Sequence, residues 1–355
     1  MQEEQELLRY WKPRIYKTEP VRTGKGDMDV SILIPVHNAM PYLYECLLSV
    51  LSQKRDGIRT EIILCDDHSD KETKEYMKSM KDTLASRFGR CVYTDTGERR
   101  GAAAARNACL RCASGEYVFF IDADDSLLSD IFLSELYHMA KAEDADIVYA
   151  GMRRIRRGIP ETGRKRRQIR VTSDYNEFSS MPGYLIAKLI KRSLFDGLFC
   201  PEELWFEDTV TQLLLVPRCE KVVFSGIYDY GYRVNEQSLT YKKDSTPRAL
   251  EAVWIQKAVL METEETGIRE ERKKEWFVKF ANHTGPLLWN RIRKRPKEER
   301  KAAYNYARVL VKEAERYCGV KCPKGISIAA WVLDKGNFAI WELICKAEIL
   351  GGALK

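Results

Sequence analysis

The sequence has no run of 18 or more apolar residues, which argues against a membrane-spanning helix. Its first six residues, Met-Gln-Glu-Glu-Gln-Glu, are polar and acidic, whereas a secretory signal is basic and then apolar. We therefore expect the protein to stay in the cytoplasm, where it could lie peripherally at the inner face of the membrane.

Glycine-rich nucleotide loops are missing as well. No Gly-x-Gly-x-x-Gly follows a predicted strand, which argues against a dinucleotide-dependent dehydrogenase. No Gly-x-x-x-x-Gly-Lys-Ser/Thr occurs either, which argues against a P-loop enzyme. If the predicted sheet binds a phosphate group, the negative charge of that group must therefore be neutralised by something other than a glycine-rich loop.

Cysteine is present ten times, but the residues are scattered and no export signal precedes them. Free, mostly buried thiols in a reducing compartment are therefore expected. The alternative is a structural zinc held by Cys109, Cys112, Cys318 and Cys322. Against it, the two pairs lie far apart in the sequence, and Cys109 and Cys112 fall on one face of a predicted helix.

Positive charge is concentrated rather than spread. The 355 residues carry a net charge of +7, with 45% hydrophobic and 31% charged residues, as in a soluble globular protein. The basic residues gather in two segments, which are solvated loops or binding surfaces for an anionic group such as a lipid headgroup, a diphosphate or nucleic acid. The members are Arg153, Arg154, Arg156, Arg157, Arg164, Lys165, Arg166, Arg167 and Arg170, and then Arg291, Arg293, Lys294, Arg295 and Lys297.

Strand and helix patterns alternate over the first 150 residues. Such alternation predicts an α/β fold with a mostly parallel sheet flanked by helices, and ligands of these sheets bind at the carboxyl ends of the strands. The predicted strands are 30–36, 61–65, 91–93, 117–121 and 146–150, and the predicted helices are 43–51, 71–85, 102–113 and 129–141.

Three regions are expected along the chain. Residues 1–28 form an irregular N-terminal extension, 29–245 the α/β domain, and 246–355 a helical appendage that holds five of the seven tryptophans. The helical structure of the last region is predicted from its alternating charged residues and apolar stripes.

The first two strand ends carry polar side chains. Pro35-Val36-His37-Asn38 follows the first strand, where proline fixes the backbone and an imidazole can stack on a planar base. Asp67 follows the second strand and can accept a hydrogen bond from a base. The simpler interpretation is helix capping by Ser69 or Asp70.

Three carboxylates follow the fourth strand, in Asp122-Ala123-Asp124-Asp125. Carboxylates so close together repel unless a cation or hydrogen bonds intervene. Hard oxygen ligands at a buried strand end suit Mg2+ or Mn2+, with phosphate oxygens completing the coordination. Capping of the next helix near Ser129-Asp130 is the alternative, and it accounts for one acid but not for three.

These segments, in this order, resemble the family-2 glycosyltransferases with the GT-A fold. The resemblance covers residues 29 to 242 and leaves the last hundred open. The matching segments are Ser31–Asn38, Tyr42-Leu-x-x-Cys-Leu-x-Ser49, Gln53, Glu61-Ile-Ile-Leu-x-Asp-Asp67, Gly101, Ala105-Arg-Asn107, Gly115–Asp125, Lys188-Leu-x-Lys-Arg192, Glu207-Asp208 and Tyr232-Arg-x-x-x-x-Ser-Leu-Thr240.

The resemblance implies an inverting transfer of a sugar from a nucleotide diphosphate, with a UDP-sugar expected, to an acceptor hydroxyl. Asp124 and Asp122 would hold Mn2+ or Mg2+ as the DXD motif, and Asp208 would be the general base, with Glu207 positioning a sugar. The donor would contact Pro35, Val36, His37, Asn38, Asp67, Arg106, Asp122 and Ala123.

Two positions depart from the family pattern. His68 stands where glycine is common, and Arg99 where asparagine often contacts the donor. Neither removes an expected catalytic group, but both leave the identity of the donor sugar open. For Glu207-Asp208, acids in the first turn of an ordinary helix are the alternative.

Other functions fit parts of the sequence. A sugar nucleotidyltransferase shares the sheet and the metal carboxylates, but its glycine- and arginine-rich opening loop is absent. A non-catalytic module that binds an anionic membrane or polymer through residues 153–170 leaves the acids unexplained. A catalytic domain that meets a carbohydrate or lipid-linked acceptor at an anionic membrane, in cell-surface polysaccharide or glycolipid synthesis, accounts for both features. No nucleic-acid partner is expected.

Overall fold

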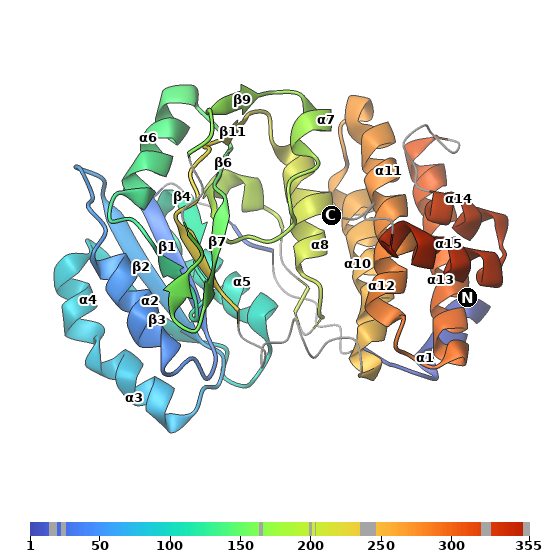
Figure 1. Ribbon diagram of the computed structural model, residues 1–355, viewed down its shortest axis with the longest axis horizontal. Coiled ribbons are helices and arrows are strands. Elements are labelled where there is room, and N and C mark those ends of the chain that lie inside the picture. Colours follow the sequence, from blue (N-terminus) through green and yellow to red (C-terminus); the bar gives the residue numbers. More distant parts are fainter. Residues whose placement is uncertain are drawn as a thin grey trace.

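A mixed β-sheet with its helices forms one half of the molecule, and a group of helices forms the other (Figure 1). The computed structural model describes residues 1–13, 20–22, 26–162, 166–198, 201–202, 204–234, 246–320 and 328–350.

The main sheet has eight strands within the described residues, in the order β3-β2-β1-β4-β10-β6-β11-β9. Its first four strands are parallel, whereas β10 runs antiparallel to both β4 and β6. The α/β prediction is thus confirmed, with a mixed rather than a wholly parallel sheet. The strands are β1 Met28–Val36, β2 Thr60–Asp66, β3 Arg90–Asp95, β4 Gly115–Phe120, β6 Ile147–Tyr149, β9 Arg170–Thr172, β10 Lys188–Lys191 and β11 Val222–Phe224.

Helices cover the sheet because its central strands are apolar on both faces. The predicted single helix over 71–85 is wrong, since the chain breaks at Met80 into two short helices. The helices of this half are α2 Tyr42–Leu51, α3 Lys71–Ser79, α4 Lys81–Arg87, α5 Ala102–Cys112 and α6 Phe132–Glu143.

A second sheet contains part of the basic segment that the sequence suggested was a loop. Its order is β5-β12-β7-β8, with β5 Ser126–Leu127, β7 Met152–Arg156, β8 Ile159–Pro160 and β12 Tyr230–Arg233. Arg153 pairs with Asp229 at 2.8 Å, and Arg166 pairs with Glu135 at 2.5 Å. Part of the positive charge is therefore neutralised within the domain, although Arg154, Arg156 and Arg157 are exposed. Arg164 and Lys165 lie outside the described residues.

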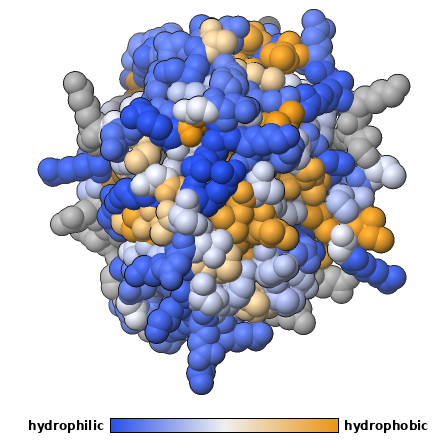
Figure 2. All heavy atoms as spheres, turned by 90° about the vertical axis from the view of Figure 1, so that its left-hand side faces the viewer, coloured by the Kyte–Doolittle hydropathy of each residue, from blue (hydrophilic) through white to orange (hydrophobic). Residues whose placement is uncertain are grey.

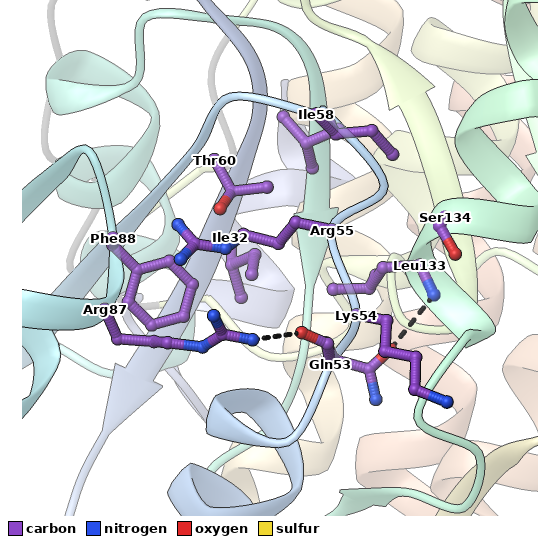
Figure 3. Close-up of a pocket in the computed structure, with 11 residues that line it drawn as sticks. Ile32, Gln53, Lys54, Arg55, Ile58, Thr60, Arg87, Phe88, Leu133 and Ser134 are labelled. Atoms are coloured by element: carbon purple, nitrogen blue, oxygen red, sulfur yellow. Dashed lines mark hydrogen bonds between the residues drawn. The ribbon is translucent and has the colours of Figure 1, made fainter.

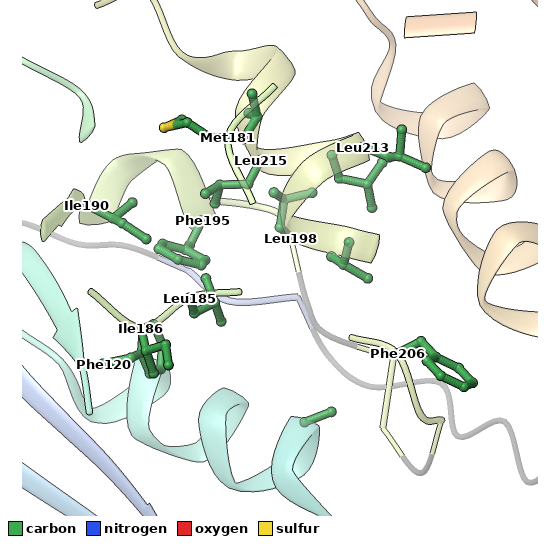
Figure 4. Close-up of a cluster of buried hydrophobic side chains, with 14 of the residues drawn as sticks. Phe120, Met181, Leu185, Ile186, Ile190, Phe195, Leu198, Phe206, Leu213 and Leu215 are labelled. Carbon is green, nitrogen blue, oxygen red and sulfur yellow. The ribbon is translucent and has the colours of Figure 1, made fainter. Parts of the chain in front are cut away.

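Short helical segments connect the sheet to the helical half. A cluster of apolar side chains joins them, and it runs from Phe120 on β4 through Phe195 and Leu198 to Phe206 and Leu213 (Figure 4). The segments are α7 Tyr175–Phe178, η1 Arg192–Phe195, α8 Asp208–Val210, the π-helix η2 Thr211–Leu215 and η3 Val216–Arg218.

The C-terminal region is helical, as predicted, and its Trp254, Trp276 and Trp341 are fully buried. The N-terminal residues belong to it. Helix α1, Gln2–Leu8, packs against α13, and Trp11 Nε1 donates to Glu251 Oε1 at 3.1 Å (Figure 1). The expectation of an irregular head was wrong for these residues. The region comprises η5 Pro247–Leu250, α10 Glu251–Thr266, η6 Glu270–Arg272, α11 Lys273–Asn282, the π-helix η7 His283–Leu287, α12 Leu288–Ile292, α13 Lys297–Cys318, α14 Ile328–Lys335 and α15 Phe338–Leu350.

The face of the sheet half that Figure 2 shows is mostly hydrophilic, with a hydrophobic area near the middle of the view. Its exposed large apolar residues include Tyr44, Leu48 and Ile159. Among the described residues, no helix combines the length and the hydrophobicity that crossing a membrane requires.

Candidate active site

The loops after β1 and β2 are tied to each other. The main-chain N–H of Asn38 donates to Ser69 Oγ at 3.2 Å, and that of Asp70 donates to Asn38 Oδ1 at 2.7 Å. His37 Nδ1 lies 2.7 Å from the main-chain oxygen of Asp67, and since a carbonyl only accepts, this nitrogen carries the proton. Asp70 caps α3, which confirms one of the two capping residues proposed from the sequence. The half-buried His37 ring is thereby fixed at the carboxyl edge of the sheet.

Asp67 is buried and holds the start of α5. Its carboxylate accepts hydrogen bonds from Thr96 Oγ1 at 2.9 Å, from the N–H of Arg100 at 2.7 Å and from that of Gly101 at 2.8 Å. Gly101 has a φ of +89°, which glycine adopts without strain, and it is the N-cap residue of α5. Asp67 therefore shapes the loop in front of α5, and its predicted contact with a nucleotide base stays a prediction.

The acidic triplet divides into one structural carboxylate and two at the surface. Asp125 is 1% exposed and accepts from Tyr230 Oη at 2.7 Å and from the N–H of Arg233 at 2.8 Å. Burial and the charges of Asp122 and Asp124 raise the pKa of Asp125 well above its usual range. Asp122 and Asp124 are half-buried, so they remain accessible at the end of β4.

Helix capping does not account for these acids. Helix α6 begins at Phe132 without a side-chain cap, and Asp130 pairs instead with Lys54 at 2.8 Å. The capping alternative near Ser129-Asp130 was therefore wrong.

Arg106 joins the two acidic motifs that the sequence singled out. It lies on α5, is 8% exposed, and donates to Asp122 Oδ1 at 3.0 Å and to Glu207 Oε1 at 2.7 Å. Two motifs separated by more than eighty residues thus meet at one edge of the sheet. Contact between Arg106 and the donor stays a prediction.

The Glu207-Asp208 segment starts a helix from a strained turn. Phe206 is buried with a φ of +72°, an uncommon conformation for a bulky side chain and one that often marks a functional site. Helix α8 begins at Asp208, as the helix-start alternative required, so the acids can serve both roles. The Asp208 side chain is about half exposed at 48%, which leaves it open to an acceptor.

Sequence reasoning missed two residues near this segment, one that ties the preceding chain to α5 and one that contacts Asp208. Glu202 is buried and receives a hydrogen bond from Asn107 Nδ2 at 3.0 Å and an ion pair from Arg100 at 2.6 Å. Arg291, on α12, places its Nη2 atom 3.4 Å from Asp208 Oδ1. The only sequence signal for Arg291 was its membership of the second basic segment.

The described carboxylates suit a cation that brings other ligands with it. No group of three or more His, Cys, Asp or Glu side chains in the described part of the chain could hold a metal by itself. Mg2+ and Mn2+ sites, however, commonly use one or two carboxylates and complete the shell with phosphate oxygens and water. Asp122 and Asp124 are such a donor set. Of the zinc alternative, Cys322 lies outside the described residues, and Cys109 and Cys318 are buried free thiols.

A small pocket lies at the opposite end of the sheet. It is lined by Gln53, Arg87, Phe88 and Leu133, with Thr60 and Ile32 from the strands (Figure 3). Thr60 is the first residue of β2, whereas Asp66 ends it. Arg87 donates to the main-chain oxygens of Leu51 and Gln53, and Gln53 bridges to Ser129 and Leu133. These contacts tie α2 to α6, and the pocket is remote from the acidic edge.

Comparison with known proteins finds similar sequences among glycosyltransferases. Residues 31–200 match the family described as "Glycosyl transferase family 2". The poly(ribitol-phosphate) beta-glucosyltransferase of Bacillus spizizenii is 29% identical over 213 residues, 58% of this chain and 32% of that protein. The Escherichia coli UDP-Glc:alpha-D-GlcNAc-diphosphoundecaprenol beta-1,3-glucosyltransferase WfaP is 34% identical over 110 residues, 31% of this chain and 41% of that protein. The chain thus spans less than half the length of either relative.

The likeness in structure reaches further than the likeness in sequence. Residues 1–349 of Staphylococcus aureus TarS, crystallised with UDP-GlcNAc, superpose with a TM-score of 0.68 at 16% identity, covering 91% of this chain and 92% of that one. The uncovered 9% is much shorter than the region from residue 246 onward. The shared fold therefore includes C-terminal helices that the sequence motifs did not reach.

Proposed function

We propose that this chain, which belongs to glycosyltransferase family 2 through residues 31–200 and has the GT-A fold, transfers a sugar from a UDP-sugar to an acceptor hydroxyl with inversion at the anomeric carbon. The observation that carries the proposal is the bridge that Arg106 makes between Asp122 and Glu207, because it joins a donor-type and an acceptor-type acidic motif in one site. The acceptor belongs to a cell-surface polysaccharide or glycolipid, in line with the names of the B. spizizenii and E. coli relatives.

The donor half of the site consists of the loops after β1, β2 and β4. His37, held by the main-chain oxygen of Asp67, offers a ring face to the base. Asp122 and Asp124 are the residues that would hold a divalent cation. When bound, such a cation stabilises the charge of the departing diphosphate. Arg106 keeps Asp122 and Glu207 in fixed positions around the reacting sugar.

The acceptor half is the start of α8. Asp208 removes the proton of the acceptor hydroxyl as the oxygen attacks the anomeric carbon from the face opposite to the diphosphate. Glu207 orients the sugar while its carboxylate stays paired with Arg106. Because Asp208 is about half exposed at 48%, a bulky acceptor can approach it.

The test is release of UDP from a panel of UDP-sugars, with Mn2+ or with EDTA, by the wild type, by Asp208→Asn and by Asp130→Asn. We expect slow, metal-dependent hydrolysis of one donor, reduced about 10²- to 10⁴-fold in Asp208→Asn. The exposed Asp130, paired with Lys54, is the matched control and should leave the rate unchanged. Calorimetric titration with UDP accompanies the assay. Absence of hydrolysis together with absence of metal-dependent UDP binding would overturn the proposal and favour the non-catalytic binding module.

Peripheral contact with an anionic membrane belongs to the same proposal. The exposed Arg154, Arg156 and Arg157 lie on the β7–β8 hairpin next to Ile159, which is 72% exposed. Basic side chains beside an exposed apolar one favour an anionic bilayer surface. The triple variant R154Q/R156Q/R157Q should float less with vesicles containing phosphatidylglycerol than the wild type does. Equal flotation of the two proteins would remove this part of the proposal.

A further inference from the structure

Arg291 reaches the Glu207-Asp208 segment from the C-terminal helices. Its Nη2 atom lies 3.4 Å from Asp208 Oδ1, and its Nη1 atom lies 3.2 Å from Thr209 Oγ1. Its guanidinium carbon lies 4.2 Å from the centre of the Phe206 ring. One planar side chain thus contacts three of the four residues between 206 and 209.

Arg291 is largely buried, so its charge depends on the acids that it contacts. The Arg291 side chain is only 12% exposed, and a buried cation is costly unless it is paired. Lys279 and His283 lie on the same side of the helical region and add no negative charge. Burial lowers the pKa of Arg291, and the charges of Asp208 and Glu207 oppose this lowering. These two acids therefore compensate the buried cation.

The two oxygens of the Asp208 carboxylate differ in the hydrogen bonds that they accept. Oδ1 accepts from the N–H of Thr209 at 3.1 Å and from Arg291 at 3.4 Å. Within the described residues, Oδ2 receives no hydrogen bond. A carboxylate held through one oxygen presents the other in a fixed direction, which is what proton transfer from a bound hydroxyl requires.

Helix α12 is itself held firmly. Leu288 and Ile292 are fully buried and Trp289 is 7% exposed. The helix packs against α10, η7 and α15. Arg291 therefore projects from a rigid support and not from a mobile loop, so it can set the orientation of its partner.

We propose that Arg291 is a positioning residue that fixes Asp208 Oδ1 and so aims Oδ2 at the acceptor hydroxyl. This inference rests on the proposed function, since it takes Asp208 as the general base. It makes the C-terminal helical region part of the active site, whereas the sequence placed the catalytic domain within residues 29–245.

The experiment compares Arg291→Ala, Arg291→Lys and Arg300→Ala in the full chain. Arg300 is the matched control, because it is a partly buried arginine of the same region that bonds Glu342 at 2.6 Å away from the acidic edge. We expect Arg291→Ala to lower kcat about 10- to 100-fold with the KM for the donor and the Kd for UDP within about twofold of wild type. Arg300→Ala should keep the wild-type kcat.

Two readouts separate positioning from a purely structural role. Added guanidine should restore part of the kcat of Arg291→Ala and none of that of Asp208→Asn. Arg291→Lys, which keeps the charge but loses the planar fork, should lose less kcat than Arg291→Ala, because a cation can still pair with Asp208. The other ionisable groups of this region are the same in every variant, so they do not account for a difference between variants. They are Glu207 with its partner Arg106, Lys279 and His283.

Several results would overturn the inference. One is a wild-type kcat in Arg291→Ala. If the alanine variant does not fold, Arg291→Gln takes its place, because glutamine keeps a polar group but loses the charge and the guanidinium fork. A wild-type kcat in folded Arg291→Gln would then overturn the inference. A kcat loss that guanidine does not relieve and that Arg291→Lys shares in full also contradicts positioning. Failure of the proposed function is distinct, because the wild type itself would then neither hydrolyse a UDP-sugar nor bind UDP in a metal-dependent way.

Discussion

A side chain at Gly183 would collide with the main chain of Asp208, because a Cβ atom there would lie 2.2 Å from the Asp208 carbonyl oxygen. Gly183 belongs to the turn before β10, and Lys188 of that strand donates to the carbonyl oxygen of the next residue, Tyr184, at 2.5 Å. Lys188 is fully buried, with its Nζ atom 4.0 Å from the centre of the Tyr184 ring. The turn that leads into β10 therefore packs directly against the start of α8, and it leaves no space for a methyl group at Gly183.

Gly183→Ala should impair catalysis more than stability. Displacing the start of α8 moves Asp208, and a misplacement near 1 Å can cost about 100-fold in rate. The measurement is kcat beside the melting temperature. Gly89→Ala is the control, because a Cβ there would meet its nearest atom, on the Met28 side chain, at an ordinary 3.4 Å. Equal activities of the two variants would contradict the close approach.

Asp124→Asn should weaken the metal dependence of donor binding. An amide is a poorer ligand than a carboxylate, and even loss of an outer-shell partner commonly costs about 10- to 100-fold in metal affinity. Titration of Mn2+ in the presence of UDP measures the effect, with Asp130→Asn as the control. An unchanged Mn2+ titration would exclude Asp124 as a ligand.

Asp67→Asn should loosen the loop in front of α5. In the variant, an amide nitrogen replaces one acceptor oxygen and faces either the Gly101 N–H or the donors of Thr96 and Arg100. At least one buried hydrogen bond is therefore lost, at a cost of about 1–3 kcal/mol. Urea unfolding measures the stability, and UDP titration shows whether nucleotide binding weakens with it. The control is Asp95→Asn, an exposed carboxylate that accepts the N–H of Gly97 at 2.8 Å. A loss of stability as small as that of Asp95→Asn would contradict the role assigned to Asp67.

His283 should make the protein less stable in mild acid. Burial, and then the charges of Arg291 and Lys279, lower the pKa of His283 from 6.5 to about 3, while the unfolded chain keeps the ordinary value. The unfolded state therefore binds the proton first, so stability present above pH 6.5 is lost as the pH falls toward 3, by up to about 1.4 kcal/mol per pH unit.

The measurement is the free energy of unfolding in urea at pH 7, 6 and 5 for the wild type and for His283→Asn. The variant should show a shallower decline with acid. His138→Asn, on the exposed side of α6, should follow the wild type. Parallel curves for the wild type and His283→Asn would refute the assignment.

The part of the site that the sequence predicted lies at strand ends. A buried apolar run identifies a strand, and polar residues directly after it must emerge at the carboxyl edge, so His37, Asp67 and Asp122 could be placed by local pattern alone. The structural role of Asp125 was not predictable in this way, because its partners Tyr230 and Arg233 lie on a strand more than a hundred residues later.

Contacts between distant segments account for the other misses. Nothing in the local sequence of Arg291 distinguishes it from Arg293 or Arg295. Only the packing of α12 against α10, which also contacts α8, brings it to a residue 83 positions earlier. The same holds for α1, whose amphipathic pattern is too short to be separated from an irregular segment without the partner helix α13.

Arg106 also has a consequence for the order in which ligands arrive. Since its guanidinium already neutralises Asp122, a bare divalent ion meets a competitor at this edge and gains little by binding alone. A cation that arrives with a diphosphate brings negative charge for the arginine to attract. We therefore expect Arg106 to select against the free ion and for the metal–nucleotide complex, which would protect the empty site from occupation by whichever divalent ion is abundant.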